Sequence, residues 1–196
     1  MVSTPGAKPT GLVLLDRQLW VFDQSDGSAA VVNTSTAKVA DTFTVTARSG
    51  FAAAGFGSIW VPDFTGTGHA VDRVDPRTHS VTATYPTGGA ELAVATGAGS
   101  VWITENADNT VIRLDPATGK VVASISVPSP TGVLVHANQV WVASYTTTTL
   151  TTIDATTNAI RGSVSLSGPG QNILASATSL WVSQSDGSLT QITPTG

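Results

Sequence analysis

Apolar and polar positions alternate in short runs along the whole chain, and these runs recur with a period of about 40 residues. Each period contains one tryptophan, with an apolar residue before it and a β-branched residue after it. The tryptophans are Trp20, Trp60, Trp102, Trp141 and Trp181. Because successive strand residues point to opposite faces, such a triplet predicts a strand that is buried on both faces. The regular spacing predicts a repeat architecture.

Each tryptophan strand is preceded by a tight turn, clearest at Gly57-Ser58 and Gly99-Ser100. Before the turn lies a short strand of small apolar residues, such as 92–95. After the tryptophan come a polar turn and a third strand, which ends in an Asx residue with a threonine three positions later. The Asx residues are Asn33, Asp75, Asp115 and Asp154. An Asx side chain accepts backbone N–H bonds two or three residues on, so this pair predicts a closed turn into a fourth strand.

Four short strands joined by tight turns predict one antiparallel sheet per repeat. A single sheet of this kind would expose apolar side chains on both faces, so the copies must stack around an axis. The predicted fold is therefore an all-β β-propeller of about five four-stranded blades. The repeats span about 10–50, 51–90, 91–130, 131–170 and 171–196. Residues 10–196 are expected to form one propeller domain, preceded by an N-terminal tail of residues 1–9.

The last repeat ends at its third-strand turn, so 19 strands are expected and the last blade is incomplete. A five-bladed ring and a fragment of a larger propeller, for example a seven-bladed one, both fit this pattern. The segment 2–4 is a candidate for the missing strand, although Pro5 and Pro9 interrupt it. Without that strand, the edge at residues 189–193 is unpaired. Unpaired edges pair with other chains, which predicts edge-mediated self-association.

Composition narrows the classes of partner. The chain of 196 residues is 41% hydrophobic and only 11% charged, with a net charge of −4 and scattered basic residues. A folded domain is expected, and nucleic acid is not an expected partner. There is no cysteine and no apolar run long enough to span a membrane. Residues 1–10 lack the apolar core of a signal peptide. The richness in Thr, Ser, Gly and Ala is nevertheless typical of exported bacterial domains and favours an extracytoplasmic or cell-surface location.

The segment 102–122, with Trp102-Ile103-Thr104-Glu105 followed by Leu114-Asp115-Pro116-Ala117-Thr118-Gly119, resembles the YVTN (YncE-like) repeat. It is also similar to the related streptogramin lyase (virginiamycin B lyase-like) propeller. The resemblance implies a β-propeller, usually of about seven blades. For the lyase it implies a metal, histidines and a glutamate at one mouth of the propeller. Thr104-Glu105 matches the Thr-Glu that often ends the family's tryptophan strand, whereas no histidine of this chain aligns with the family's site.

The third position after each tryptophan is the first candidate site. Asp23, Asp63 and Glu105 occupy it in the first three repeats. Equivalent repeat positions point to one region of a ring, so these three carboxylates are candidate ligands for a divalent cation. The alternative is that they are solvated strand ends or partners of turn amides. The tryptophans themselves are expected to pack between blades rather than to line a binding face.

His136 is the second candidate, at the end of an apolar inner strand, where it would be a base or ligand near an axial pocket. Its alternative role is that of a turn residue beside Asn138 with a satisfied hydrogen bond. His69 and His79 are expected to be solvated residues at strand edges.

Three functional hypotheses follow. The leading one is a non-catalytic binding or scaffold module without a cofactor, part of a larger exported or cell-surface protein. It would contact a protein or small-molecule ligand through loops at one propeller mouth. The alternative is a metal-dependent lyase resembling streptogramin lyase, which would use Mg²⁺ with Glu105 and His136 to open a cyclic ester by elimination. The third is a structural arc that completes its ring only with further sequence.

Overall fold

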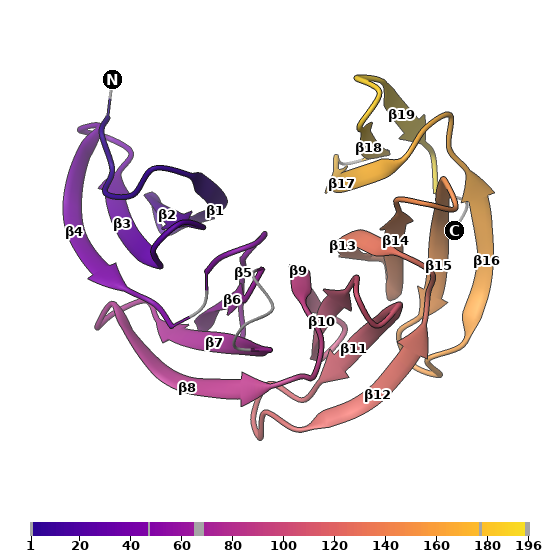
Figure 1. Ribbon diagram of the computed structural model, residues 1–196, viewed down its shortest axis with the longest axis horizontal. Helices are drawn as coiled ribbons and strands as arrows, with labels where there is room; N and C mark the ends of the chain where they lie inside the picture. Colours follow the sequence, from indigo (N-terminus) through magenta and orange to yellow (C-terminus); the bar gives the residue numbers. More distant parts are fainter. Residues whose placement is uncertain (1, 47, 65–68, 177, 195–196) are drawn as a thin grey trace. The chain divides into compact units, whose positions relative to one another are not determined.

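The chain folds into antiparallel β-sheets, each formed by one sequence repeat (Figure 1). The computed structural model describes residues 2–46, 48–64, 69–176 and 178–194, and these residues form 19 strands and no helix. Blade 1 contains β1 (Pro9–Leu15), β2 (Gln18–Asp23), β3 (Ser28–Asn33) and β4 (Lys38–Thr44). Blade 2 contains β5 (Ala53–Gly55), β6 (Ser58–Pro62), β7 (Ala70–Asp75) and β8 (Ser80–Pro86). This is the predicted all-β propeller-type arrangement.

The remaining repeats follow the same order of strands. Blade 3 contains β9 (Glu91–Gly97), β10 (Ser100–Glu105), β11 (Thr110–Leu114) and β12 (Val121–Ser126). Blade 4 contains β13 (Pro130–His136), β14 (Gln139–Ser144), β15 (Thr149–Asp154) and β16 (Ile160–Ser165). Blade 5 contains β17 (Gly170–Ala175), β18 (Leu180–Gln184) and β19 (Leu189–Ile192). The three strands of blade 5 confirm that the last described sheet lacks a fourth strand.

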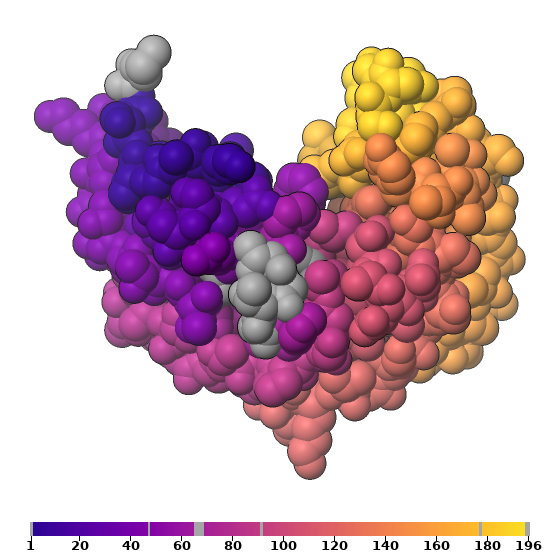
Figure 2. Space-filling model, in the orientation of Figure 1, coloured from indigo at the N-terminus to yellow at the C-terminus, as the bar shows by residue number. Residues whose placement is uncertain are grey.

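The chain divides into two compact units, Met1–Leu92 and Ala93–Gly196, with the boundary inside β9. Unit 1 holds blades 1 and 2 around a core that includes Trp20 and Ile59. Unit 2 has one core around Trp102 and a second around Trp141. The space-filling view shows that neighbouring blades within each unit pack side by side (Figure 2). That the chain acts as one propeller domain stays a prediction.

The tryptophan strand is the most buried strand of most blades. All six residues of β10 are buried, as expected for a strand with apolar side chains on both faces. Trp20, Trp60 and Trp102 are fully buried, and Trp141 is 6% exposed. Trp181 differs, because 38% of it is exposed and its neighbour Leu174 is 70% exposed. The prediction that every tryptophan packs between blades is therefore wrong for Trp181.

The first turn of each four-stranded blade places two residues in the left-handed region. The pairs are Asp16-Arg17, Phe56-Gly57, Ala98-Gly99 and Ala137-Asn138, with φ between 47° and 72°. Two consecutive positive φ angles define a type I′ turn, whose twist matches that of the two strands it joins. Gly57 and Gly99 are thus second in their turns, whereas Ser58 and Ser100 already begin the next strand. The sequence placed these turns one residue too late.

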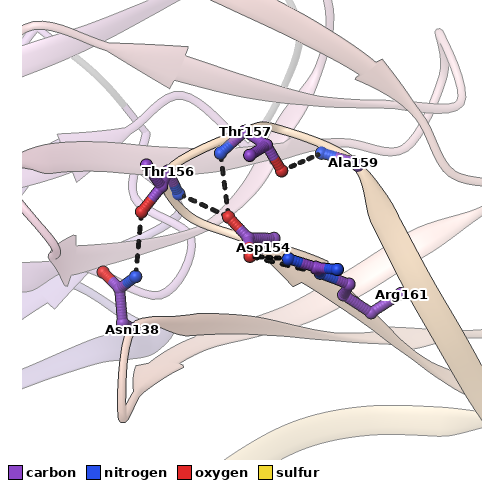
Figure 3. A network of polar contacts seen from close by, with 6 residues as sticks. All are labelled: Asn138, Asp154, Thr156, Thr157, Ala159 and Arg161. Atoms are coloured by element: carbon purple, nitrogen blue, oxygen red, sulfur yellow. Dashed lines mark hydrogen bonds and ion pairs between the residues drawn. The ribbon is translucent and has the colours of Figure 1, made fainter.

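The predicted Asx turns between the third and fourth strands are confirmed. Asp154 Oδ1 accepts the backbone N–H groups of Thr156 (2.9 Å) and Thr157 (2.8 Å), and Arg161 binds the other carboxylate oxygen (Figure 3). Asn33 Oδ1 accepts the N–H groups of Ser35 and Thr36 in the same way. These side chains close turns and are not free ligands.

The N-terminal segment forms no strand between residues 2 and 8. Val2 and Thr4 instead line a hollow on blade 1, together with Leu12 of β1 and Val32 of β3. The segment therefore does not supply the fourth strand that the last repeat lacks.

Candidate functional site

The third residue after each tryptophan lies at the end of the second strand, and every one of these residues is buried. Asp23, Asp63, Glu105, Ser144 and Gln184 are each between 0% and 5% exposed. We call this end of a blade the loop end, and the opposite end, which carries the type I′ turns, the turn end. A buried polar side chain needs hydrogen-bond partners. The partners of these residues show what the position does.

Asp23 is saturated by its own blade. Its Oδ2 accepts the N–H of Lys8 at 2.6 Å, and its Oδ1 accepts the N–H of Ser25 at 2.7 Å as well as the Ser25 hydroxyl. A Cβ on Gly6 would lie 2.2 Å from Asp23 Cγ, so only glycine allows this close approach. The Asp23 carboxylate therefore fastens the segment before β1 to the loop end of blade 1.

Asp63 plays a similar part in blade 2. Its Oδ1 accepts the N–H of Arg48 at 3.4 Å, and its backbone forms an isolated bridge with Ser49. The Phe64 N–H donates to the Arg48 carbonyl at 2.8 Å. The segment before β5 is thereby fixed to the end of β6.

A second buried acid, Asp72 in β7, was missed by the sequence analysis. It is 1% exposed and accepts the Thr46 N–H at 2.7 Å and the Thr84 hydroxyl at 2.6 Å. The signal was present, because Asp72 stands three residues before its Asx residue, where blades 1 and 3 have the apolar Ala30 and Ile112. An acid at a position that is otherwise buried and apolar indicates a specific hydrogen-bonding role.

Glu105 and Gln184 hold the loop ends of unit 2. Glu105 Oε2 accepts the hydroxyl of Thr110, its partner across the strand pair, at 2.8 Å. Gln184 Oε1 accepts the Gly168 N–H at 2.5 Å, and its amide nitrogen donates to Ser188 and Thr190, each at 2.8 Å. This repeat position thus carries hydrogen-bonded side chains of three chemistries, Asp, Glu and Gln, whereas the buried Ser144 hydroxyl of blade 4 has no hydrogen-bond partner among the described residues.

These interactions bear on the predicted cation site. Asp23, Asp63 and Glu105 belong to three different blades, and each carboxylate has a hydrogen-bond donor within or beside its own blade. Among the residues that the structure describes, no group of three or more His, Asp or Glu side chains is placed to hold a metal ion. Asp23 and Asp63 accept backbone N–H groups, as in the turn-amide alternative, whereas Glu105 accepts the Thr110 hydroxyl. The cation site stays a prediction.

His136 lies at the opposite end of the blades from Glu105. His136 is half-buried, pairs with Gln139 and directly precedes the type I′ turn of blade 4. Ser144, which is the counterpart of Glu105 in blade 4, pairs with Pro130 at the other end of the same strand pair. Six strand residues separate the two ends by roughly 17 Å. The structure therefore does not bring the two candidate catalytic residues to one mouth.

His79 is not the solvated residue that the sequence indicated. Only 19% of its side chain is exposed, and Nδ1 lies 2.5 Å from Asp41 Oδ2 of blade 1. This hydrogen bond lowers the pKa of Asp41. Nothing in the local sequence could show this contact, because 38 residues separate the two partners.

Exposed aromatic side chains mark the loop end of blade 2. Phe51 is 39% exposed, Phe64 is 40% exposed, and Arg48 beside them is also exposed. Backbone bonds hold all three: Phe64 N–H to the Arg48 carbonyl (2.8 Å), Gly50 N–H to the Pro62 carbonyl (3.2 Å) and Phe51 N–H to the Leu92 carbonyl (2.9 Å). We call Arg48, Phe51 and Phe64 the loop-end patch.

Comparison with known proteins supports the fold. The chain is similar to the crystal structure of BamB from Moraxella catarrhalis, with a TM-score of 0.75 and 14% sequence identity. The match covers 97% of this chain and 60% of that chain, so the present chain spans less than two thirds of the protein it resembles. No protein-family model matches the sequence, and no curated protein sequence matches it significantly. At this identity the similarity shows the β-propeller fold alone. In the described residues, no helix is long and apolar enough to cross a membrane.

Proposed function

We propose that this chain is a non-catalytic β-propeller module that binds a protein partner through the loop-end patch of blade 2. The observation that carries the proposal is the exposure of Phe51 and Phe64, each about two fifths accessible, beside Arg48 on one blade end. Aromatic residues and arginine are enriched in the energetically dominant part of protein interfaces, whereas an exposed phenylalanine has no favourable interaction with water.

The rigidity of the loop end supports the same proposal. Asp63 and the backbone bonds at Arg48, Gly50 and Phe51 fix the segments that present both rings. A segment whose backbone is already held in place loses less conformational entropy on binding than a free loop does. Asp23, Asp63, Glu105 and Gln184 have hydrogen-bond partners within the fold at the loop ends, which favours a binding or scaffold role over catalysis.

The wider setting of the module is proposed on composition and length. Charged residues make up only 11% of the chain, which is rich in Thr, Ser, Gly and Ala, and this favours an exported or cell-surface protein. The match to 60% of a longer propeller chain is consistent with a module of a larger protein. The finer resemblance to YVTN and streptogramin lyase repeats stays a prediction.

The test is a comparative capture from an extract of the host organism. The baits are the wild-type chain, the double variant Phe51→Ser/Phe64→Ser, and the control Phe56→Ser. Phe56 is 42% exposed in the type I′ turn of the same blade, so it matches the patch in exposure but lies at the turn end. The proposal is supported by a captured protein that meets three conditions. It binds the wild type and the control, its capture by the double variant is at least tenfold lower, and it binds the purified wild-type chain in a direct assay. Equal capture by all three baits contradicts it.

A further inference from the structure

Two exposed apolar faces lie outside the loop-end patch. On blade 1, Leu12 is 61% exposed and borders a hollow of about 300 Å³. Leu19, the buried Val21 and Val32, and Val2 and Thr4 of the N-terminal segment also line this hollow. On blade 5, Leu174, Trp181 and Leu189 are 70%, 38% and 66% exposed and border a hollow of about 350 Å³. Groups of neighbouring exposed apolar side chains, unlike single ones, are typical of interaction surfaces.

The contact between blades 4 and 5 shows what covers each kind of face. Trp141 of blade 4 is buried in one cluster with Ile173, Leu180 and Val182 of blade 5, and Leu134 packs against the same cluster. One face of blade 5 thus covers the tryptophan face of blade 4. The other face of blade 5 carries Trp181.

The strand register identifies the equivalent residues in the exposed faces. Ile173 pairs with Val182 in blade 5, as Leu12 pairs with Val21 in blade 1. The exposed face of blade 1 is therefore the counterpart of the surface that covers Trp141.

The exposed face of blade 5 is the counterpart of the Trp141 face of blade 4, which blade 5 covers. Leu174 pairs with Trp181 as Leu134 pairs with Trp141. The chain thus exposes, on two different blades, both complementary halves of a contact that it also makes internally.

We propose that a second copy of this chain is the partner for these faces, with blade 1 of one molecule packed on blade 5 of the other. Leu12 would cover Trp181 in the way that Ile173 covers Trp141. The contact uses two different surfaces and is heterologous, so each molecule offers one donor face and one acceptor face. The residues that border the two hollows include no charged side chain, so the association is expected to be insensitive to salt.

The experiment is analytical ultracentrifugation of the full chain from micromolar to sub-millimolar concentration, at low and high salt. The variants are Leu12→Glu, which disrupts the blade 1 face, and Trp181→Glu, which disrupts the blade 5 face. Both positions are exposed, so the variants should fold, and circular dichroism checks this. The control Val122→Glu changes a 55% exposed residue of β12 that lines neither hollow.

The wild type and the control are expected to associate with concentration, and each of the other variants alone is expected to be monomeric. An equimolar mixture of Leu12→Glu and Trp181→Glu should form dimers that grow no further, because one intact pair of faces remains. A monomeric wild type, a mixture that stays monomeric, or association that only Trp181→Glu abolishes would overturn the proposal.

Discussion

The imidazole ring of His79 lies edge-on against the indole of Trp20, with ring centroids 5.0 Å apart and ring planes at 85°. His79 ends the Asx turn of blade 2, and Trp20 lies in the tryptophan strand of blade 1, so this contact joins two blades. His79 also stacks on Phe43 of blade 1, with a centroid distance of 6.1 Å. Like other edge-to-face pairs, this arrangement adds to the stabilisation from burial alone.

Unit 2 contains an equivalent contact with other chemistry. Asn158 of blade 4 lies at the same position of its Asx turn as His79 in blade 2, and both residues have a positive φ, 62° for Asn158 and 52° for His79. Its Oδ1 accepts Arg113 Nη1 at 2.9 Å, and the Arg113 guanidinium lies 5.1 Å from the centre of the Trp102 ring. In blades 2 and 4, the last residue of the Asx turn thus reaches the tryptophan of the preceding blade, directly or through an arginine.

Replacing His79 with asparagine should weaken the packing between blades 1 and 2. Asparagine tolerates a positive φ, so His79→Asn removes the ring contacts and the hydrogen bond to Asp41 without straining the turn. We expect a loss of about 1 kcal/mol in the free energy of unfolding, measured by urea titration. His69→Asn is the comparison, because His69 also has a positive φ (47°) and is exposed, and its ring makes a single hydrogen bond, to the Gly89 carbonyl at 3.0 Å, with no ring contact to a tryptophan among the described residues. An unchanged stability of His79→Asn would show that neither the ring contacts nor the bond to Asp41 contributes to stability.

The two tryptophans with the greatest contrast in burial should differ sharply in their contribution to stability. Trp102 is fully buried, so Trp102→Ala should cost about 3–5 kcal/mol. Trp181 is 38% exposed, so Trp181→Ala should cost less than half as much at concentrations below those of self-association. Denaturant titration of both variants measures the difference. Equal losses would mean that Trp181 is buried in solution even at low concentration.

The turn at Asp16-Arg17 offers a stabilising substitution. Arg17 has φ of 63°, which is unfavourable for a residue with a side chain, and blades 2 and 3 have Gly57 and Gly99 at this position. Arg17→Gly should raise the free energy of unfolding by about 0.5–1 kcal/mol. The Arg17 carbonyl, which accepts two bonds from Thr34, is retained. Thermal unfolding provides the measurement, with Gln18→Gly in strand β2 as a control that should destabilise.

Acid should weaken the Asx turns. The Thr118 N–H and hydroxyl bonds lower the pKa of Asp115, and the Arg161 guanidinium followed by the Thr157 N–H lowers that of Asp154. Because the folded pKa lies below the unfolded one, each carboxylate contributes its full stabilisation above its ordinary pKa of about 3.9 and loses it as the pH falls through the folded value. Asp115→Asn should therefore make the melting temperature less dependent on pH below about pH 4.

The comparison is a thermal melt series of wild type and Asp115→Asn from neutral to acidic pH. Asparagine keeps the accepting oxygen, as Asn33 does in blade 1, so the turn should survive the change. Identical pH dependence of the two proteins would contradict the assignment of Asp115.

We expect no magnesium-dependent opening of streptogramin-type cyclic esters. Glu105 is 2% exposed and bound to Thr110 at the loop end, while His136 lies at the turn end, so one substrate cannot reach both. Chromatography of the substrate after incubation with purified protein, with and without Mg²⁺, provides the test. Turnover that Glu105→Gln or His136→Ala abolishes would establish the lyase alternative instead.

The sequence alone determined the strand order, the number of strands and the Asx turns. These features follow from local physics: alternation of apolar residues selects strands, and the carboxylate of Asp115 reaches amides only two and three residues away. The position of the polar residues at the strand ends was also evident from the repeat. Asp72 was detectable as well, from the apolar residues at its position in other blades.

Only the tertiary structure decided how those residues are used. Trp141 and Trp181 have the same local pattern, yet one is covered by the next blade and the other is exposed. Asp23 meets Lys8 and His79 meets Asp41, across 15 and 38 residues of chain. Burial and hydrogen-bond partners depend on which distant segments meet in space, and a repeat pattern specifies each blade without specifying what covers it.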